Sequence, residues 1–318
     1  INMDKEKLIQ IISKSRPKAK DSTVKMYVSN LMKLMKLYEK DNLDFLKKPE
    51  EIEDKLSTLH YTTRRNYLNS IIVYLMAVKD KDDPLIKEFS DIRDTHNKKY
   101  EEEQATGIIS DKQKENFVDI SEVNNMINKM GQEIKDKKLK KKEDLTAKDK
   151  NLIQVYTLFN IYTRLPLRND LAGMEVINKR EYNKLSEEDK KAENYLVINK
   201  NKMFFVLNKY KTSSKYEELK IDIPKDLEKL LRQYIRINGM GVLFKSSTGK
   251  PLSRNSLSQL LLKTSNKYMG KSISSTMLRK IYLSSKYADM KEELEKDNKV
   301  MGHSKEVAMD TYIKKPQK

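Results

Sequence analysis

The chain has 318 residues and a mass of 37.4 kDa, which is long enough for two domains that each bury a core of their own. Its 65 Lys and Arg outnumber 47 Asp and Glu, and the resulting formal net charge of +18 predicts an anionic partner. The absence of cysteine excludes disulfides, thiol nucleophiles and cysteine-ligated metal sites, and three histidines are too few for a histidine-rich metal centre. We therefore expect no metal and no cofactor.

Apolar residues are distributed periodically and never approach a run of 18, so we expect no membrane partner. The first residues carry no apolar core of the kind a signal peptide needs, which predicts an intracellular location. Only 8 Gly and 7 Pro occur in the chain, and this scarcity favours long helices.

The first part of the chain predicts an all-α domain over residues 1–100. Apolar residues recur at helical spacing over 24–38 and again over 68–76, and Pro84 is suited to the first turn of a third helix that runs toward Tyr100. Apolar periodicity then fades, and charged residues with Gly and Thr replace it, which predicts a linker over 101–112.

Polar donors gather at the start of the second of these helices, where Arg64, Arg65 and Asn69 occupy its first turns. They are either contacts to a nucleic-acid backbone or an ordinary solvated face of the helix. Both interpretations stay open from the sequence.

Residues 113–318 predict a second domain that is α+β and mostly α, with a small antiparallel sheet. The predicted strands are rich in β-branched and aromatic residues and cover 195–198, 203–207 and 219–224. The predicted helices lie near 120–130, 152–162, 167–171, 225–237, 254–268 and 276–287, with short ones near Glu292 and Glu306.

The run from Lys135 to Lys150 is rich in lysine and low in complexity. A solvated loop is the favoured interpretation, and a flexible arm that contacts phosphates is the alternative.

The motifs of nucleotide chemistry are missing from the sequence, which has neither the glycine-rich phosphate loop nor the dinucleotide fingerprint. A strongly basic chain of this kind binds DNA or RNA, and any chemistry it performs there uses neither nucleotide nor metal. Phosphoryl transfer under those conditions needs Arg and Lys to neutralise oxygens, a side-chain oxygen to attack, and an acid for the leaving oxygen.

Such groups occur in a recognisable order in the second half. Arg168 follows the apolar helix, Lys211 follows the second strand, Arg279 lies early in a helix, and Gly302-His303-Ser304 precedes Tyr312. Together these elements resemble the tyrosine recombinase (phage integrase) family. The residues that carry the resemblance lie within 113–318. The first 100 residues resemble the family only in their general type, as a helical, SAM-like core-binding domain.

The resemblance implies a role for each of these residues. Tyr312 would attack the scissile phosphate and form a 3′-phosphotyrosine link. Arg168 and Arg279 would clamp the nonbridging oxygens, which lysine does poorly. Lys211 would protonate the departing 5′ oxygen, and His303 would hydrogen-bond the phosphate.

The sequence departs from the family's pattern at two positions. Where the family usually has His three residues before the second arginine, this chain has Thr276, a hydroxyl that donates a hydrogen bond but cannot act as an acid or base near neutral pH. The family's acidic residue three positions after the first arginine is replaced by Asp170, which lies two positions after Arg168.

Two further assignments depend on local context. Lys209 and Lys215 are alternatives to Lys211 as the acid. Arg254 and Asn255 begin a predicted helix, where backbone N–H groups and the guanidinium can meet phosphate.

These residues predict a site-specific DNA recombinase or integrase whose partner is double-stranded DNA and which acts wherever that DNA lies. The resemblance implies a homotetramer on paired sites, with a monomer possible without DNA.

A type IB topoisomerase, which shares the chemistry, and a DNA-binding relative with weakened catalysis are the alternatives. The abundance of Lys, Asn and Ile suggests an AT-rich genome such as that of a large DNA virus or mobile element.

Overall fold

The computed structural model describes residues 3–210, 218–302 and 304–313, with the side chains of Lys112 and Tyr312 left aside. Close contacts divide the chain between Ile109 and Ser110 into two compact units.

The first unit is all-α. Its elements are α1 (Lys5–Ser15), α2 (Asp21–Leu37), the 3₁₀ turn η1 (Asp44–Lys47), α3 (Pro49–Lys55), α4 (Tyr61–Val78) and α5 (Pro84–Ala105). α5 continues past Tyr100 because its last turns, although poor in apolar residues, are rich in strong helix formers such as Glu, Gln and Ala. The expected helices are present, and α1 and α3 are additional to them.

The core of the first unit is built from one apolar stripe on each helix. Val24, Val28 and Leu31 recur at helical spacing on α2 and are buried, together with Leu68 and Phe89 from α4 and α5. α4 packs against α1, α2 and α5 and is the central helix of this unit.

The second unit combines helices with a five-stranded sheet. Its elements are α6 (Asp111–Lys114), α7 (Ile120–Asp136), η2 (Leu139–Lys141), α8 (Ala147–Tyr162), η3 (Asn169–Leu171), β1 (Glu175–Asn178), α9 (Lys179–Tyr182), α10 (Glu187–Ala192), β2 (Tyr195–Ile198), β3 (Met203–Leu207), β4 (Leu219–Asp222), α11 (Lys225–Asn238), β5 (Gly241–Val242), α12 (Arg254–Met269), α13 (Ser275–Met301), α14 (Lys305–Val307) and the π-helical turn η4 (Ala308–Tyr312). The mostly α class with a small sheet is confirmed.

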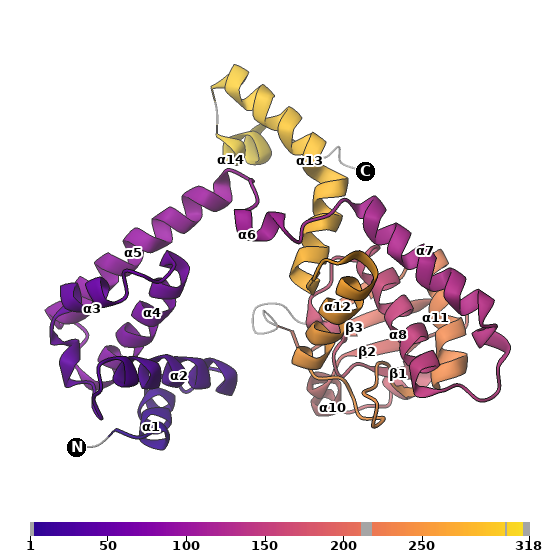
Figure 1. Ribbon diagram of the computed structural model, residues 1–318, viewed down its shortest axis with the longest axis horizontal. Coiled ribbons are helices and arrows are strands. Elements are labelled where there is room, and N and C mark those ends of the chain that lie inside the picture. The colour runs from indigo at the N-terminus through magenta and orange to yellow at the C-terminus, as the bar shows by residue number, and fades with distance from the viewer. Residues whose placement is uncertain (1–2, 211–217, 303, 314–318) are drawn as a thin grey trace. The chain divides into compact units, whose positions relative to one another are not determined.

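α8 is the central helix of the second unit. A capping box between Thr146 and Asp149 fixes its start, and apolar residues then occur on all sides of it, which is typical of a helix enclosed by others. It contacts α7, α11, α12 and α13 (Figure 1). The residues that follow its C-terminus therefore extend from a helix enclosed by the core of the unit.

The sheet has the order β4-β3-β2-β1-β5 and is mixed. The three predicted strands pair antiparallel as expected, but β1 pairs parallel with β2 through a crossover that contains α9 and α10. Alternate residues face opposite ways: Phe205 joins the main core, whereas Phe204 and Val206 join a small cluster with Tyr182 of α9. The crossover thus covers the sheet face that the main core does not use.

Three local expectations are corrected. The helices expected near 276–287 and Glu292 form one helix, α13, because no Gly or Pro interrupts 275–301. The helix expected over 167–171 is the short 3₁₀ turn η3, since Pro166 and Gly173, whose φ is +71°, limit helix on both sides.

The third correction concerns the lysine-rich run over 135–150, which contains regular structure rather than a solvated loop alone. α7 extends into it, Leu139 of η2 is buried, and α8 begins within it. Lys142 pairs with Asp149 at 3.0 Å.

Among the described residues, no helix combines the length and the apolar character needed to cross a membrane.

Replacing Phe159, which is fully buried in α8, by alanine should lower the free energy of unfolding by about 3–5 kcal/mol because it leaves a cavity among packed helices. Urea denaturation followed by circular dichroism measures this as a lower midpoint at unchanged slope. Lys150→Ala, at an exposed position of the same helix, is the control and should shift the midpoint little. Equal shifts for the two variants would contradict the central place of α8.

Candidate active site

The first predicted arginine lies on the turn between α8 and the sheet. Arg168 has extended backbone at the start of η3, and its carbonyl oxygen accepts a hydrogen bond of 3.1 Å from the hydroxyl of Tyr162, the last residue of α8. Tyr162 is buried, and this burial raises the pKa of its hydroxyl, which therefore stays protonated as a donor. The Arg168 side chain is exposed and makes no hydrogen bond or ion pair with another described residue. α8 thus fixes the backbone of Arg168 through Tyr162, while the guanidinium of Arg168 is exposed to solvent.

The second predicted arginine lies in the first turns of α13, which begins after the N-cap residue Ser274. Arg279 is half-buried, and its Nε is buried without a hydrogen-bond partner among the described residues. Burial, and next the positive charge of Arg168, lower the pKa of this guanidinium. The structure therefore brings Arg168 and Arg279 within electrostatic range of each other.

Thr276 lies one turn before Arg279, on the same side of α13. Its Oγ1 accepts a hydrogen bond of 3.2 Å from Nη2 of Arg279. The threonine hydroxyl occupies the position at which the sequence departs from the family's histidine, and here it orients the guanidinium. The hydroxyl proton remains free for a further bond.

Asp170 pairs with a different arginine from the one considered in the sequence. Its Oδ1 accepts a hydrogen bond of 2.8 Å from Nη2 of Arg254, whereas Arg168 acts on it only through charge. Asp170 is buried, and burial raises its pKa, although Arg254 and then Arg168 and Arg279 oppose that rise. Asp170 thus holds α12 against the arginine turn.

α12 is attached to the same turn by a second contact. Nδ2 of Asn169 donates to Oγ of Ser258 at 2.7 Å. Arg254 and Asn255, the predicted DNA contacts, begin this helix as expected, and both are exposed as residues. Arg254 therefore has a structural role through Asp170, and contact with DNA by either residue stays a prediction.

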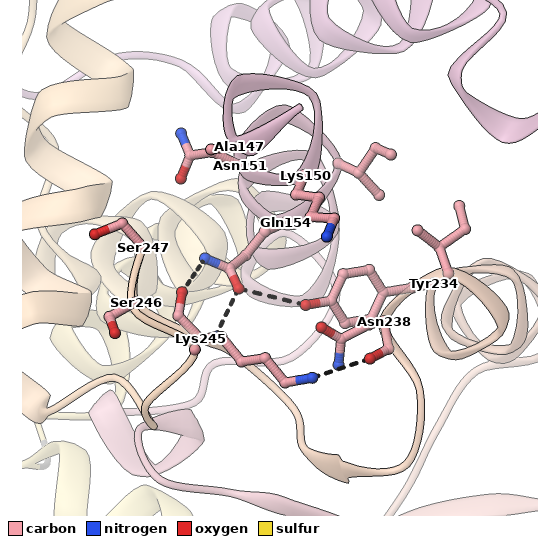
Figure 2. A pocket seen from close by; sticks show the side chains of 12 residues that line it. Ala147, Lys150, Asn151, Gln154, Tyr234, Asn238, Lys245, Ser246 and Ser247 are labelled. Carbon is pink, nitrogen blue, oxygen red and sulfur yellow. Dashed lines mark hydrogen bonds between the residues drawn. The ribbon is translucent and has the colours of Figure 1, made fainter. Parts of the chain in front are cut away.

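The segment that leads into α12 is fixed by a buried amide of α8. Gln154 donates from Nε2 to the carbonyl of Lys245 at 2.9 Å and accepts from its backbone N–H at 2.8 Å. The hydroxyl of Tyr234, which donates to the carbonyl of Leu243 at 2.7 Å, lies 3.4 Å from the same amide oxygen (Figure 2). A cavity of about 390 Å³ lies beside this amide, with Lys150 and Ser246 among its lining residues. None of the predicted site residues that the structure describes lines this cavity.

Of three predicted site residues, the structure describes only a part or nothing. Lys211 and His303, and the alternative acid Lys215, lie outside the described residues, and Lys209 is exposed just after β3. Tyr312 ends the turn η4, and only its backbone is described.

The segment that carries Tyr312 lies away from the two arginines. From Arg279 to Met301 the helix α13 runs 22 residues, which corresponds to about 33 Å along its axis. α14, which precedes η4, contacts α13 and lies beside the far half of it (Figure 1). Thr276 thus contacts Arg279, and the charge of Arg168 reaches Arg279, whereas the turn that carries the predicted nucleophile lies beside the other end of α13.

The three predicted contacts of the first unit lie on α4. Arg64 pairs with Glu53 at 3.1 Å, and the guanidinium of Arg65 lies 4.4 Å from the ring centroid of Tyr100. Asn69 is half-buried. Both arginines thus have partners within the fold, and a role of the three residues in DNA binding stays a prediction.

Sequence reasoning missed Tyr162, Asn194 and Gln154, which hold the site in place. Gln154 interrupts an apolar helix, Tyr162 ends that helix, and Asn194 immediately precedes an apolar strand. A polar residue inside or beside a buried run is the signal that could have found them, because burial requires such a group to find a partner.

No group of three or more histidine, aspartate or glutamate side chains within the described ranges is arranged to hold a metal ion.

Comparison with known proteins found no matching family model and no matching curated protein. Solved structures do match. The post-cleavage complex of the XerH site-specific recombinase with palindromic difH substrate is 15% identical at a TM-score of 0.48, covering 95% of this chain and 78% of that one. The pre-cleavage complex of XerH with difH is 13% identical at 0.46, covering 98% and 85%, and the XerA recombinase is 9% identical at 0.35, covering 99% and 95%. At these scores the overlap carries no argument about function, which is proposed below from the site.

Replacing Arg254 by alanine should leave the buried carboxylate of Asp170 without its ion-pair partner and raise its pKa further. A folded-state pKa above the ordinary 3.8 means that the native protein binds the additional proton, so stability falls as pH rises through the folded pKa. The side chain of Arg254 is 54% exposed, so the loss at pH 7 should be about 1–2 kcal/mol, and it should shrink toward pH 4.5.

Urea denaturation at the two pH values measures this difference, with the exposed neighbour variant Asn255→Ala as the control. A loss that is equal at pH 7 and pH 4.5 would contradict a charged interaction between Asp170 and Arg254.

Proposed function

We propose that this protein is a DNA strand-transfer enzyme of the tyrosine recombinase type, which cleaves and rejoins DNA through a 3′-phosphotyrosine intermediate. The observation that carries the proposal is the pair Arg168 and Arg279, two guanidinium groups in electrostatic range of each other at the end of α8 and the start of α13.

Two positive charges held close together cost free energy unless an anion lies between them. Asp170, a carboxylate whose charge acts on both arginines, is engaged with Arg254. The buried Nε of Arg279 has no hydrogen-bond partner in the described part of the chain. A phosphate group supplies the missing negative charge and matches the planar fork of arginine with two parallel hydrogen bonds.

The remaining roles follow from the resemblance. Tyr312 attacks the phosphorus, the bond to the 5′ oxygen breaks, and Lys211 gives that oxygen its proton. His303 donates to the phosphate. The ester to tyrosine conserves the energy of the broken bond, so rejoining needs neither ATP nor metal.

Thr276 is best explained as a positioning group. By accepting from Arg279 it sets the direction of the guanidinium, and its own proton is free to reach a phosphate oxygen. This supports catalysis with a hydroxyl where the family usually has an imidazole.

Double-stranded DNA is the proposed partner. A net charge of +18 favours a polyphosphate as the partner. We propose four protomers on two paired duplexes and a monomer without DNA. Since Tyr312 lies at the far end of α13, assembly on DNA has to bring that segment to the arginines.

A covalent adduct tests the proposal directly. Wild-type protein incubated with nicked duplexes of randomised sequence should trap DNA in an adduct that survives denaturing electrophoresis, because the nick lets the 5′ fragment diffuse away. Tyr312→Phe should bind the same pool and give no adduct. Sequencing of the trapped DNA yields the site.

Tight binding without any wild-type adduct would contradict the enzyme and leave the DNA-binding alternative. Once a site is known, relaxation of supercoils by single protomers would favour the type IB topoisomerase alternative, whereas paired-site products would favour the recombinase.

The two arginines should not tolerate lysine. Arg168→Lys and Arg279→Lys keep the charge but lose the bidentate fork, and each should slow adduct formation by about 100-fold or more. Arg180→Lys, at an exposed position of α9, is the matched control and should leave the rate unchanged. Wild-type rates in both site variants would remove the phosphate clamp on which the proposal depends.

A further inference from the structure

Asn194 is a buried amide, 4% exposed, between α10 and β2, and every hydrogen-bonding position of its side chain is used. Its Nδ2 donates to the carbonyl of Asp170 at 3.0 Å and to that of Lys209 at 3.1 Å. Its Oδ1 accepts from the backbone N–H of Asn208 at 2.9 Å and of Lys209 at 2.8 Å. Two donors and two acceptor positions are all that an amide offers, so the group is fully satisfied.

These four bonds join two segments that carry predicted catalytic residues. Asp170 lies in the η3 turn two residues after Arg168, and Lys209 lies two residues before Lys211. The Asn194 side chain is therefore a bridge between the arginine turn and the backbone from which the lysine segment departs. A buried, fully paired bridge fixes these two backbones relative to each other.

Two further contacts hold the same region. Nη2 of Arg254 also donates to the carbonyl of Lys209, at 3.4 Å. On the far side of the segment 211–217, the hydroxyl of Tyr182 in α9 donates to Oε2 of Glu218 at 2.6 Å. The β1–β2 crossover, which contains Tyr182 and ends at Asn194, thus supplies an anchor on each side of that segment.

We propose that Asn194 is a positioning residue for the general acid. By fixing the backbone of Asn208 and Lys209 to the Arg168 turn, it sets where the chain enters the segment with Lys211 relative to the phosphate that Arg168 holds. The inference rests on the proposed function, because it assigns to Asn194 a part in the same cleavage step.

The leaving group distinguishes this role from general support of the fold. In the natural substrate the phosphorus–oxygen bond to O5′ breaks, the new bond to the Tyr312 hydroxyl oxygen forms, and O5′ takes a proton from Lys211. In a substrate with sulfur at the 5′ bridging position, the phosphorus–sulfur bond breaks and a thiolate leaves, which needs no proton. A residue that acts through the acid matters for the first substrate and not for the second.

The experiment compares adduct formation by the full chain on nicked duplexes with either bridging atom, at the site found above. Lys211→Ala should slow cleavage of the oxygen substrate by about 100-fold or more and be rescued by sulfur. Asn194→Ala should slow the oxygen reaction by about 10-fold or more and change the sulfur reaction by less than about 3-fold. Asn201→Ala, an exposed asparagine in the turn between β2 and β3, is the matched control and should behave like wild type on both.

Asn194→Asp provides a second variant if alanine weakens the fold. It keeps the acceptors for the two N–H groups but loses both donors, and it should show the same preference for the sulfur substrate. Thermal unfolding confirms that each variant is native at the assay temperature.

The possible failures differ from one another. Equal slowing of both substrates, or no slowing of either, in the Asn194 variants overturns the positioning role while wild-type adducts still stand. If Lys211→Ala slows both substrates equally or slows neither, Lys211 is not the general acid, and the positioning role of Asn194 is overturned with it. No wild-type adduct on either substrate overturns the proposed function itself.

Discussion

The mutual repulsion of two guanidinium groups is the constraint on which the site depends. Arg168 and Arg279 come from distant parts of the chain, and only a well-braced fold can hold them together without an anion between them. The bracing comes from neutral or paired groups: the hydroxyl of Tyr162 on the Arg168 carbonyl and the hydroxyl of Thr276 on the Arg279 guanidinium. If the proposed function holds, the free energy gained by neutralising the pair is retained for the phosphate of the DNA.

Features with a local cause were predictable from the sequence. β2 and β3 have the expected bounds because short β-rich runs are separated by turn residues, and α12 begins where expected because Ser253 caps it. Arg279 lies early in a helix for the same kind of reason. The fold class followed from such patterns, and the candidate residues followed from a resemblance in their order.

Features that depend on distant partners were not predictable. Arg254 and Asp170 are separated by 84 positions, and the residues next to either of them in the sequence do not indicate that the two form an ion pair. β1 and β5 are too short for a periodic signal; they form because β1 pairs with β2 on one side and with β5 on the other. The Asn194 bridge likewise joins residues 15 and 24 positions away, so its importance appears only once the sheet is assembled.

The order of pairing in the sheet also has a consequence for synthesis of the chain. β1 needs β2 as its parallel partner and then β5, which is more than 60 residues later in the sequence, at Gly241–Val242. Non-local pairings of this kind form late because the intervening loops must close first. A nascent chain still lacking α12 leaves the Asp170 carboxylate without Arg254, and Arg279 follows later still. The arginine pair is therefore complete only after the start of α13 has been synthesised, well after the strands β1 to β5.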